Sequence, residues 1–106
     1  MLESKFKTRL KDRLKKEFPG CIVMHLDPNE IQGIPDLIIL YKDRWAVLEG
    51  KRHANANVQP NQEYYVKLMG SMSYASFIYP ENMEVVIREL QQAFTSERQA
   101  RLPKRV

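Results

Sequence analysis

The segment from Gly33 to Lys51 constrains the fold of this chain more than any other stretch. Its first part, residues 33–40, reads GIPDLIIL, and its last part, residues 45–51, reads WAVLEGK. Two apolar runs separated by a tight turn at residues 42–44 predict two adjacent strands, 35–42 and 45–51. Residues 37–40 are apolar without alternation, which is typical of a strand buried on both faces. We therefore expect helices on both faces of the sheet.

Three helices are predicted around this hairpin. The first spans residues 2–18, because apolar residues recur at every fourth position before Pro19 and Gly20 end the pattern. Its apolar stripe consists of Leu2, Phe6, Leu10, Leu14 and Phe18. The second spans about residues 60–72, since Pro60 suits the first position of a helix. Its expected inner side consists of Tyr64, Tyr65, Leu68, Met69 and Met72. Pro80 opens the third. Its apolar face carries Met83, Val86, Ile87, Leu90 and Phe94.

Two further strands complete the predicted sheet. Residues 21–26 are almost all apolar, so we expect this strand to be central, and residues 74–79 predict the last strand. The expected fold class is α/β, with a mixed central sheet flanked by helices in the order α-β-β-β-α-β-α. The helices at 2–18 and 60–72 are its predicted main covers.

Length and composition limit the class of protein. The 106 residues suffice for one domain with one modest core. No apolar run approaches the roughly 20 residues that span a bilayer, and no signal peptide opens the chain, so we expect a cytoplasmic protein. The single cysteine, Cys21, excludes an internal disulfide and is interpreted as a small buried residue. A net charge of +4 favours a polyanionic partner.

Three charged side chains are expected to meet at one end of the predicted hairpin. Asp36 opens its first strand, while Glu49 and Lys51 close its second strand and point to the same face. In an antiparallel pair, the start of one strand lies beside the end of the next. Neighbouring carboxylates repel each other unless a cation lies between them, and oxygen ligands suit Mg²⁺ or Mn²⁺. The backbone carbonyl of Gly50 is a candidate third ligand, because glycine allows close approach.

This combination of residues points to phosphodiester hydrolysis. A divalent ion lowers the pKa of a coordinated water and neutralises charge on a phosphate, and Lys51 can orient that water or take its proton. Taken separately, an acid after Pro35 is ordinary turn chemistry, and Glu49 with Lys51 is an ordinary surface ion pair. We favour the functional interpretation because the acids and the lysine occur together, with apolar strands on both sides.

The same residues resemble the signature of a known nuclease superfamily. Residues 35–36 (PD) and 49–51 (EGK) are similar to the PD-(D/E)xK motif. The preceding helix with Glu3, the block at residues 33–36 and Gln62 after the motif resemble its virus-type replication-repair (VRR) nuclease branch. The resemblance covers about residues 2–80. Stand-alone members of this branch are small and often phage-encoded, and some resemble Holliday junction resolvases.

The resemblance implies roles for particular residues of a restriction-endonuclease-like core. Asp36 and Glu49 are expected to bind the metal and Lys51 to act in catalysis, with Glu3 supporting the metal site. Gln62 matches the helix glutamine of the family, and Gln59 is the second candidate. From the residues alone, Glu3 is either exposed at a frayed helix end or aimed at the sheet. Residues 1–94 are then a single nuclease domain, and residues 95–106 a basic, loosely ordered tail.

DNA is the expected partner, and basic residues are expected to mark its path by contacting phosphates. The candidates are Arg52, His53, Lys7 and Lys11, together with other cations of the first helix and the tail. No base-reading helix is evident, so we expect selectivity for DNA structure, such as a Holliday junction or another branched form. Cutting two strands requires two sites, which predicts a homodimer formed through Tyr74, Phe77, Tyr79 or the final helix. The alternatives are a non-catalytic nucleic-acid-binding module on the same fold and a small adaptor protein.

Overall fold

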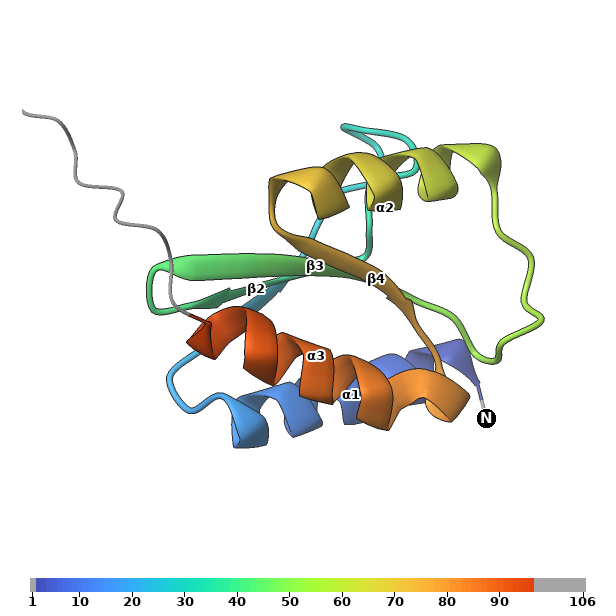
Figure 1. Cartoon of the computed structure of the whole chain (residues 1–106). Helices are drawn as coiled ribbons and strands as arrows, with labels where there is room; N and C mark the ends of the chain where they lie inside the picture. Colours follow the sequence, from blue (N-terminus) through green and yellow to red (C-terminus); the bar gives the residue numbers. More distant parts are fainter. Residues whose placement is uncertain (1, 97–106) are drawn as a thin grey trace, which may run out of the picture.

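A computed structural model describes residues 2–96 of the chain (Figure 1). The elements are α1 (Glu3–Glu17), β1 (Ile22–His25), β2 (Leu37–Tyr41), β3 (Arg44–Gly50), α2 (Pro60–Met72), β4 (Tyr74–Ile78), a short 3₁₀ turn (Pro80–Asn82) and α3 (Met83–Thr95). The predicted α/β class and the order α-β-β-β-α-β-α are confirmed. Residues 97–106, which make up most of the predicted tail, lie outside the described residues. No helix within residues 2–96 is long and apolar enough to cross a membrane.

The four strands form one mixed sheet in the order β1-β2-β3-β4. β1, β2 and β3 pair antiparallel. β2 and β3 are joined by a two-residue turn in which Lys42 adopts a left-handed φ of 57°. β4 pairs parallel to β3, which requires a crossover connection, and α2 provides it. β1, β2 and β4 are shorter than predicted, whereas β3 has the predicted length but is shifted by one residue, so that Arg44 begins it instead of ending the turn.

The core lies on the face of the sheet that α1 and α3 cover together (Figure 1). The predicted stripe of α1 is buried from Phe6 to Phe18, whereas Leu2 at its start is exposed. The predicted apolar face of α3 packs beside it through Val86, Ile87, Leu90 and Phe94. The prediction that α1 and α2 are the main covers is therefore wrong for this face, where α3 completes the core.

α2 covers the opposite face, over β3 and β4, and none of its residues is fully buried. Tyr65 and Met69 are half-buried as expected, but Tyr64, Leu68 and Met72 are exposed. The face of α2 that meets the sheet therefore differs from the predicted one. Gln62 lies on this inner face, and successive residues of a helix are separated by 100° of rotation. The inward positions are therefore those three, four and seven residues after Gln62.

β1 is an edge strand, so the expectation that residues 21–26 form a central strand is wrong. Val23 and Cys21 pack against the core on one face of the sheet. Ile22 and Met24 point to the other face and are 55% and 46% exposed. The physical reason is that α2 lies over β3 and β4 and does not reach this side of the sheet, so apolar residues of β1 remain uncovered.

Candidate active site

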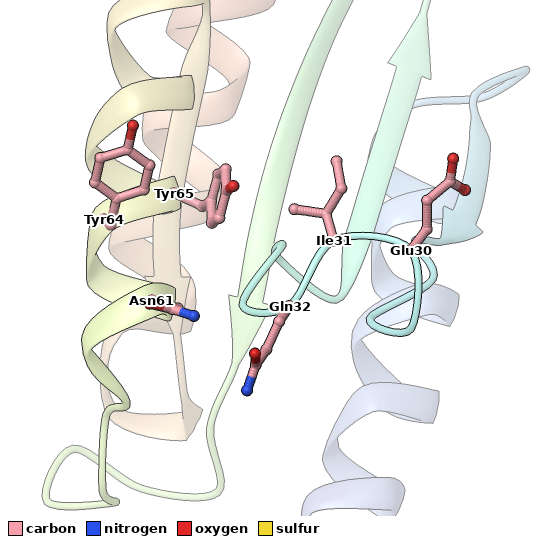
Figure 2. A pocket seen from close by; sticks show the side chains of 6 residues that line it. All are labelled: Glu30, Ile31, Gln32, Asn61, Tyr64 and Tyr65. Carbon is pink, nitrogen blue, oxygen red and sulfur yellow. The ribbon is translucent and has the colours of Figure 1, made fainter.

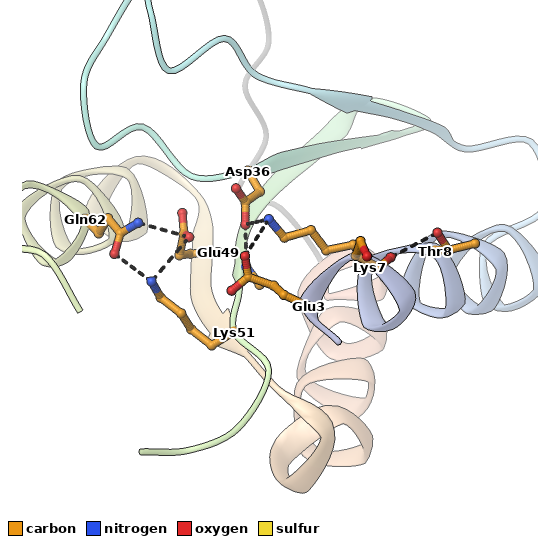
Figure 3. Close-up of polar contacts among 9 residues, drawn as sticks. Glu3, Lys7, Thr8, Asp36, Glu49, Lys51 and Gln62 are labelled. Carbon is orange, nitrogen blue, oxygen red and sulfur yellow. Dashed lines mark hydrogen bonds and ion pairs between the residues drawn. The ribbon is translucent and has the colours of Figure 1, made fainter. Parts of the chain in front are cut away.

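The predicted site lies at the end of the β2–β3 hairpin (Figure 3). Leu37 of β2 pairs with Leu48 of β3, and continuing this register places Asp36 opposite Glu49. The backbone N–H of Leu26 donates to the carbonyl oxygen of Asp36 at 2.9 Å, which extends the β1–β2 pairing by one residue. The backbone of Asp36 is therefore held on the β1 side, and the register places Asp36 beside the end of β3, where the sequence predicted it.

The carboxylate of Asp36 is held by two donors. Its Oδ2 accepts a hydrogen bond from the backbone N–H of Gly50 at 2.9 Å and lies 3.0 Å from Nζ of Lys7. Lys7 also lies 3.5 Å from Oε2 of Glu3, one helical turn away. Burial alone would lower the pKa of Lys7, but its contacts with Asp36 and Glu3 outweigh burial and raise it. An ammonium therefore occupies one side of Asp36 in this structure.

Glycine at position 50 makes room for this contact. A Cβ on Gly50 would lie 3.2 Å from Cε of Lys7 and 3.5 Å from Oδ2 of Asp36. A side chain here would require the side chain of Lys7 to shift by a few tenths of an ångström. Close approach at Gly50 was predicted for a metal ion at its carbonyl oxygen, and that role stays a prediction; the structure places Lys7 of α1 there.

Glu49, Lys51 and Gln62 form a second cluster on the side of α2 (Figure 3). Nζ of Lys51 donates to Oε1 of Gln62 at 2.7 Å and lies 3.8 Å from Oε2 of Glu49. Nε2 of Gln62 donates to the same Glu49 oxygen at 3.3 Å. Glu49 is 3% exposed and Lys51 is 8% exposed. Two ionisable side chains are thus withdrawn from water and bridged by one neutral amide.

The first turn of α2 fixes this amide. The backbone N–H of Gln59, at the N-cap of α2, donates to Oε1 of Gln62 at 3.1 Å. Of the two glutamine candidates, the structure therefore brings the side chain of Gln62 to Lys51, and Gln59 contacts the cluster through its backbone.

The environment of Glu49 disfavours a negative charge. Burial, the charge of Asp36 and a hydrogen bond with its carboxyl group raise the pKa of Glu49 to about 8, although Lys51 and Lys7 pull it down. This agrees with the strand register, which places the carboxyl groups of Asp36 and Glu49 on neighbouring strand ends (Figure 3). A carboxyl pair in which one member holds a proton is the electrostatic signature expected of a site that binds a cation between them.

The two carboxyl groups of the site can serve as ligands of a hard divalent cation, but they form an incomplete ligand set by themselves. Within residues 2–96, no group of three or more His, Cys, Asp or Glu side chains could hold a metal ion. Asp36 and Glu49 supply two carboxylates, and Mg²⁺ often binds to one or two carboxylates while retaining waters. Glu3 lies beside Lys7 on the outer side of Asp36, so the structure brings it to the edge of the site.

The predicted DNA contacts lie in different settings. Arg52 directly follows Lys51 and is exposed. His53 is half-buried, and its Nδ1 accepts a hydrogen bond from the N–H of Asn55 at 3.1 Å. Lys11, one turn after Lys7 on α1, lies 3.1 Å from Nε2 of His25. Lys7 is engaged with Asp36, a contact that sequence reasoning missed. The spacing of Glu3 and Lys7, four residues apart on one helix face, was the available signal.

The overall fold is similar to that of VRR_NUC domains. No family model matches the sequence, and no curated protein matches it. One solved structure, a "VRR_NUC domain", has 19% sequence identity and a TM-score of 0.67, covering 81% of this chain and 94% of its own. Another, a "VRR_NUC domain protein", has 18% identity and a TM-score of 0.62, covering 88% of each chain. The chain therefore has a VRR_NUC-like fold, which is consistent with the PD-(D/E)xK motif at Asp36, Glu49 and Lys51.

Proposed function

We propose that this protein is a Mg²⁺- or Mn²⁺-dependent DNA endonuclease that hydrolyses phosphodiester bonds and selects branched DNA by its structure. One observation carries the proposal: two adjacent carboxyl groups, Asp36 and Glu49, lie beside a buried lysine at the end of one hairpin. The VRR_NUC-like fold supports it. Acting on DNA, the enzyme would work in the cytoplasm, that of a bacterial host if the gene is carried by a phage.

The residues of the site have separable tasks in this proposal. Asp36, Glu49 and the carbonyl of Gly50 would hold the ion, which when bound supplies charge neutralisation at the phosphate and a more acidic water. Glu49 must release its proton before it can act as a ligand. Gln62 holds Nζ of Lys51 in one direction, so that this group can donate to a phosphate oxygen or move a proton to or from the attacking water.

Cleavage assays test the proposal directly. Supercoiled plasmid, linear duplex, flap, fork and four-way junction substrates should be incubated with Mg²⁺ or Mn²⁺. Wild type should nick or cut branched DNA faster than linear duplex. Asp36→Ala, which removes a proposed metal ligand, and Lys51→Ala, which removes a proposed general acid–base group, should each lose at least about a hundredfold in rate. Lys67→Ala, an exposed lysine of α2, is the matched control. Equal activity of wild type and both site variants would remove the assignment.

The Lys7–Asp36 contact gives a specific reason to keep a second candidate, a non-catalytic nucleic-acid-binding module. In such a module the ammonium of Lys7 would permanently take the place of a cation beside Asp36. A true metal site predicts that Mn²⁺ raises the melting temperature, because the ion binds the folded state. DNA binding without any effect of Mn²⁺ on melting or cleavage would favour the module.

We also propose that the working form is a homodimer, because each chain has one candidate site and both strands of a branch must be cut. Of the predicted interface residues, Tyr74, Phe77 and Tyr79 are half-buried, and α3 directs its apolar face to the core. Ile22 and Met24 on β1 offer an exposed apolar surface instead. Light scattering at assay concentration tests the proposal, and a monomer that cuts both strands at one branch contradicts it.

A further inference from the structure

An open groove lies between α2 and the loop that leads from β1 to β2 (Figure 2). It has a volume of about 550 Å³, which falls within the range of sites that hold small organic groups. Six residues line it: Glu30, Ile31, Gln32, Asn61, Tyr64 and Tyr65. The groove uses none of the residues assigned to catalysis above.

The groove leads toward the candidate active site. A second hollow of about 360 Å³ shares Gln32 and Asn61 with the groove and extends to Gln62, which bonds to Lys51. The loop is anchored at this point, because Gly33 has a φ of +92° and packs so closely on Asn61 that a Cβ there would overlap it. A strand whose phosphate reaches the site can therefore place a neighbouring nucleotide in the groove.

The chemistry of the lining selects the part of the nucleotide that fits. None of the six lining residues is a lysine or arginine, and Glu30 would repel a phosphate. Gln32 and Asn61 instead offer amide donors and acceptors. Tyr64 is 59% exposed and stands edge-on to Tyr65, with ring centroids 4.9 Å apart. An exposed ring of this kind provides a stacking surface for a base, which is how sequence-tolerant single-strand binding is often achieved.

We propose that this groove binds an unpaired nucleobase of the DNA strand next to the scissile phosphate, with Tyr64 as the stacking residue. The inference rests on the proposed nuclease function and deepens it, because it gives a physical basis for selecting branched DNA. A base inside a duplex is already paired and stacked, so it cannot enter the groove. A fork or a flap exposes unpaired bases beside the branch, whereas a fully paired four-way junction does so only where its arms open.

Binding measurements that require no cleavage test the inference. The protein carries Asp36→Asn in EDTA, and the probe is a fluorescent fork, either intact or with abasic sites at the three unpaired nucleotides beside the branch. Tyr64→Ala should weaken binding of the intact fork roughly fivefold to a hundredfold, and should weaken binding of fully paired duplex little. Tyr64→Phe should bind like the parent protein. Leu68→Ala, an exposed apolar residue one turn later on α2 and outside the groove, is the matched control.

The decisive comparison combines the two changes. If Tyr64 stacks on the missing base, the abasic fork should bind the Asp36→Asn parent protein and its Tyr64→Ala variant equally weakly, because each change removes the same contact. Additive losses, an equal loss on duplex and fork, or no measurable binding of the intact fork would overturn the inference. If wild type cleaves branched DNA and Tyr64→Ala does not weaken binding, the proposed base-binding role of the groove is wrong and the proposed nuclease function stands. If Tyr64→Ala and the abasic sites together weaken binding no more than either alone, and wild type does not cleave DNA, the base-binding role stands and the proposed nuclease function is wrong.

Discussion

Replacing Glu49 with glutamine should stabilise the metal-free protein and abolish the proposed nuclease activity. The pKa of Glu49 is raised from its ordinary value of 4.5 to about 8, so the folded protein keeps this proton at pH 7 and the unfolded chain does not. Between the unfolded and the folded pKa of Glu49, each rise of one pH unit lowers the free energy of unfolding by about 1.4 kcal/mol. Over the interval from pH 4.5 to pH 7 the cost reaches about 3 kcal/mol. Glutamine is uncharged in both the folded and the unfolded state, so the variant does not lose this stability as the pH rises.

The sign of the pH dependence follows from the same shift. Because the folded pKa is raised, the stability that Glu49 contributes is fully present below pH 4.5 and is lost as the pH rises through about 8. The advantage of Glu49→Gln should therefore shrink from about 3 kcal/mol at pH 7 to about 1 kcal/mol at pH 5. The glutamine can still accept from Gln62 and donate to Asp36, so the hydrogen bonds of the protonated acid are retained.

Urea denaturation in EDTA at pH 5, 6 and 7 measures this difference, since the midpoint and slope give the free energy of unfolding. Glu84→Gln is the matched control: this exposed carboxylate accepts two hydrogen bonds from Arg13, at 2.7 and 2.8 Å, which lower the pKa of Glu84. That substitution should be mildly destabilising, and less so as the pH falls. If Glu49→Gln is no more stable than wild type at pH 7, or if its advantage does not change with pH, the electrostatic reasoning is refuted.

Three further predictions concern the metal and the glycines. Mn²⁺ should raise the melting temperature more at pH 8 than at pH 6, because the proton on Glu49 competes with the ion; a pH-independent shift would contradict this. Lys7→Met should enlarge the Mn²⁺-induced shift in melting temperature, since it removes the ammonium that binds Asp36; a smaller shift would mean that Lys7 supports the metal site. Gly33→Ala should lower the free energy of unfolding by more than the ~1–2 kcal/mol of left-handed strain alone. Gly20→Ala is its control, because it has a φ of +89° with no atom nearby; equal losses would exclude the clash with α2.

Local patterns were sufficient to predict the hairpin and the meeting of its charged ends. The alternation of strand side chains and antiparallel pairing together put Asp36 beside Glu49, with Lys51 two residues along. These rules depend only on neighbouring residues and a short turn. The position of Gln62 followed from the family resemblance and from Pro60 at the start of a helix.

Features set by packing between distant elements were not predictable in this way. Apolar residues in β1 suggest burial, but they do not reveal whether a helix reaches that side of the sheet, and Ile22 and Met24 remain exposed. The rotation of α2 depends on the contact of Gln62 with Lys51, which no periodicity encodes. The contact of Lys7 with Asp36 depends on how α1 crosses the sheet, a property of the assembled core.

The crossover through α2 has a consequence for how the chain tolerates changes in length. α2 packs against β3 and β4, and this packing places Gln62 where it accepts a hydrogen bond from Lys51, directly after β3. Residues 52–59 connect the two, and of these Gln59 takes part in this placement, because its backbone N–H donates to Gln62. Insertions or deletions within residues 53–58 should therefore leave the contact of Gln62 with Lys51 intact and change only the surface beside the candidate site, so this segment is the natural place in which to engineer binding to the proposed DNA substrate.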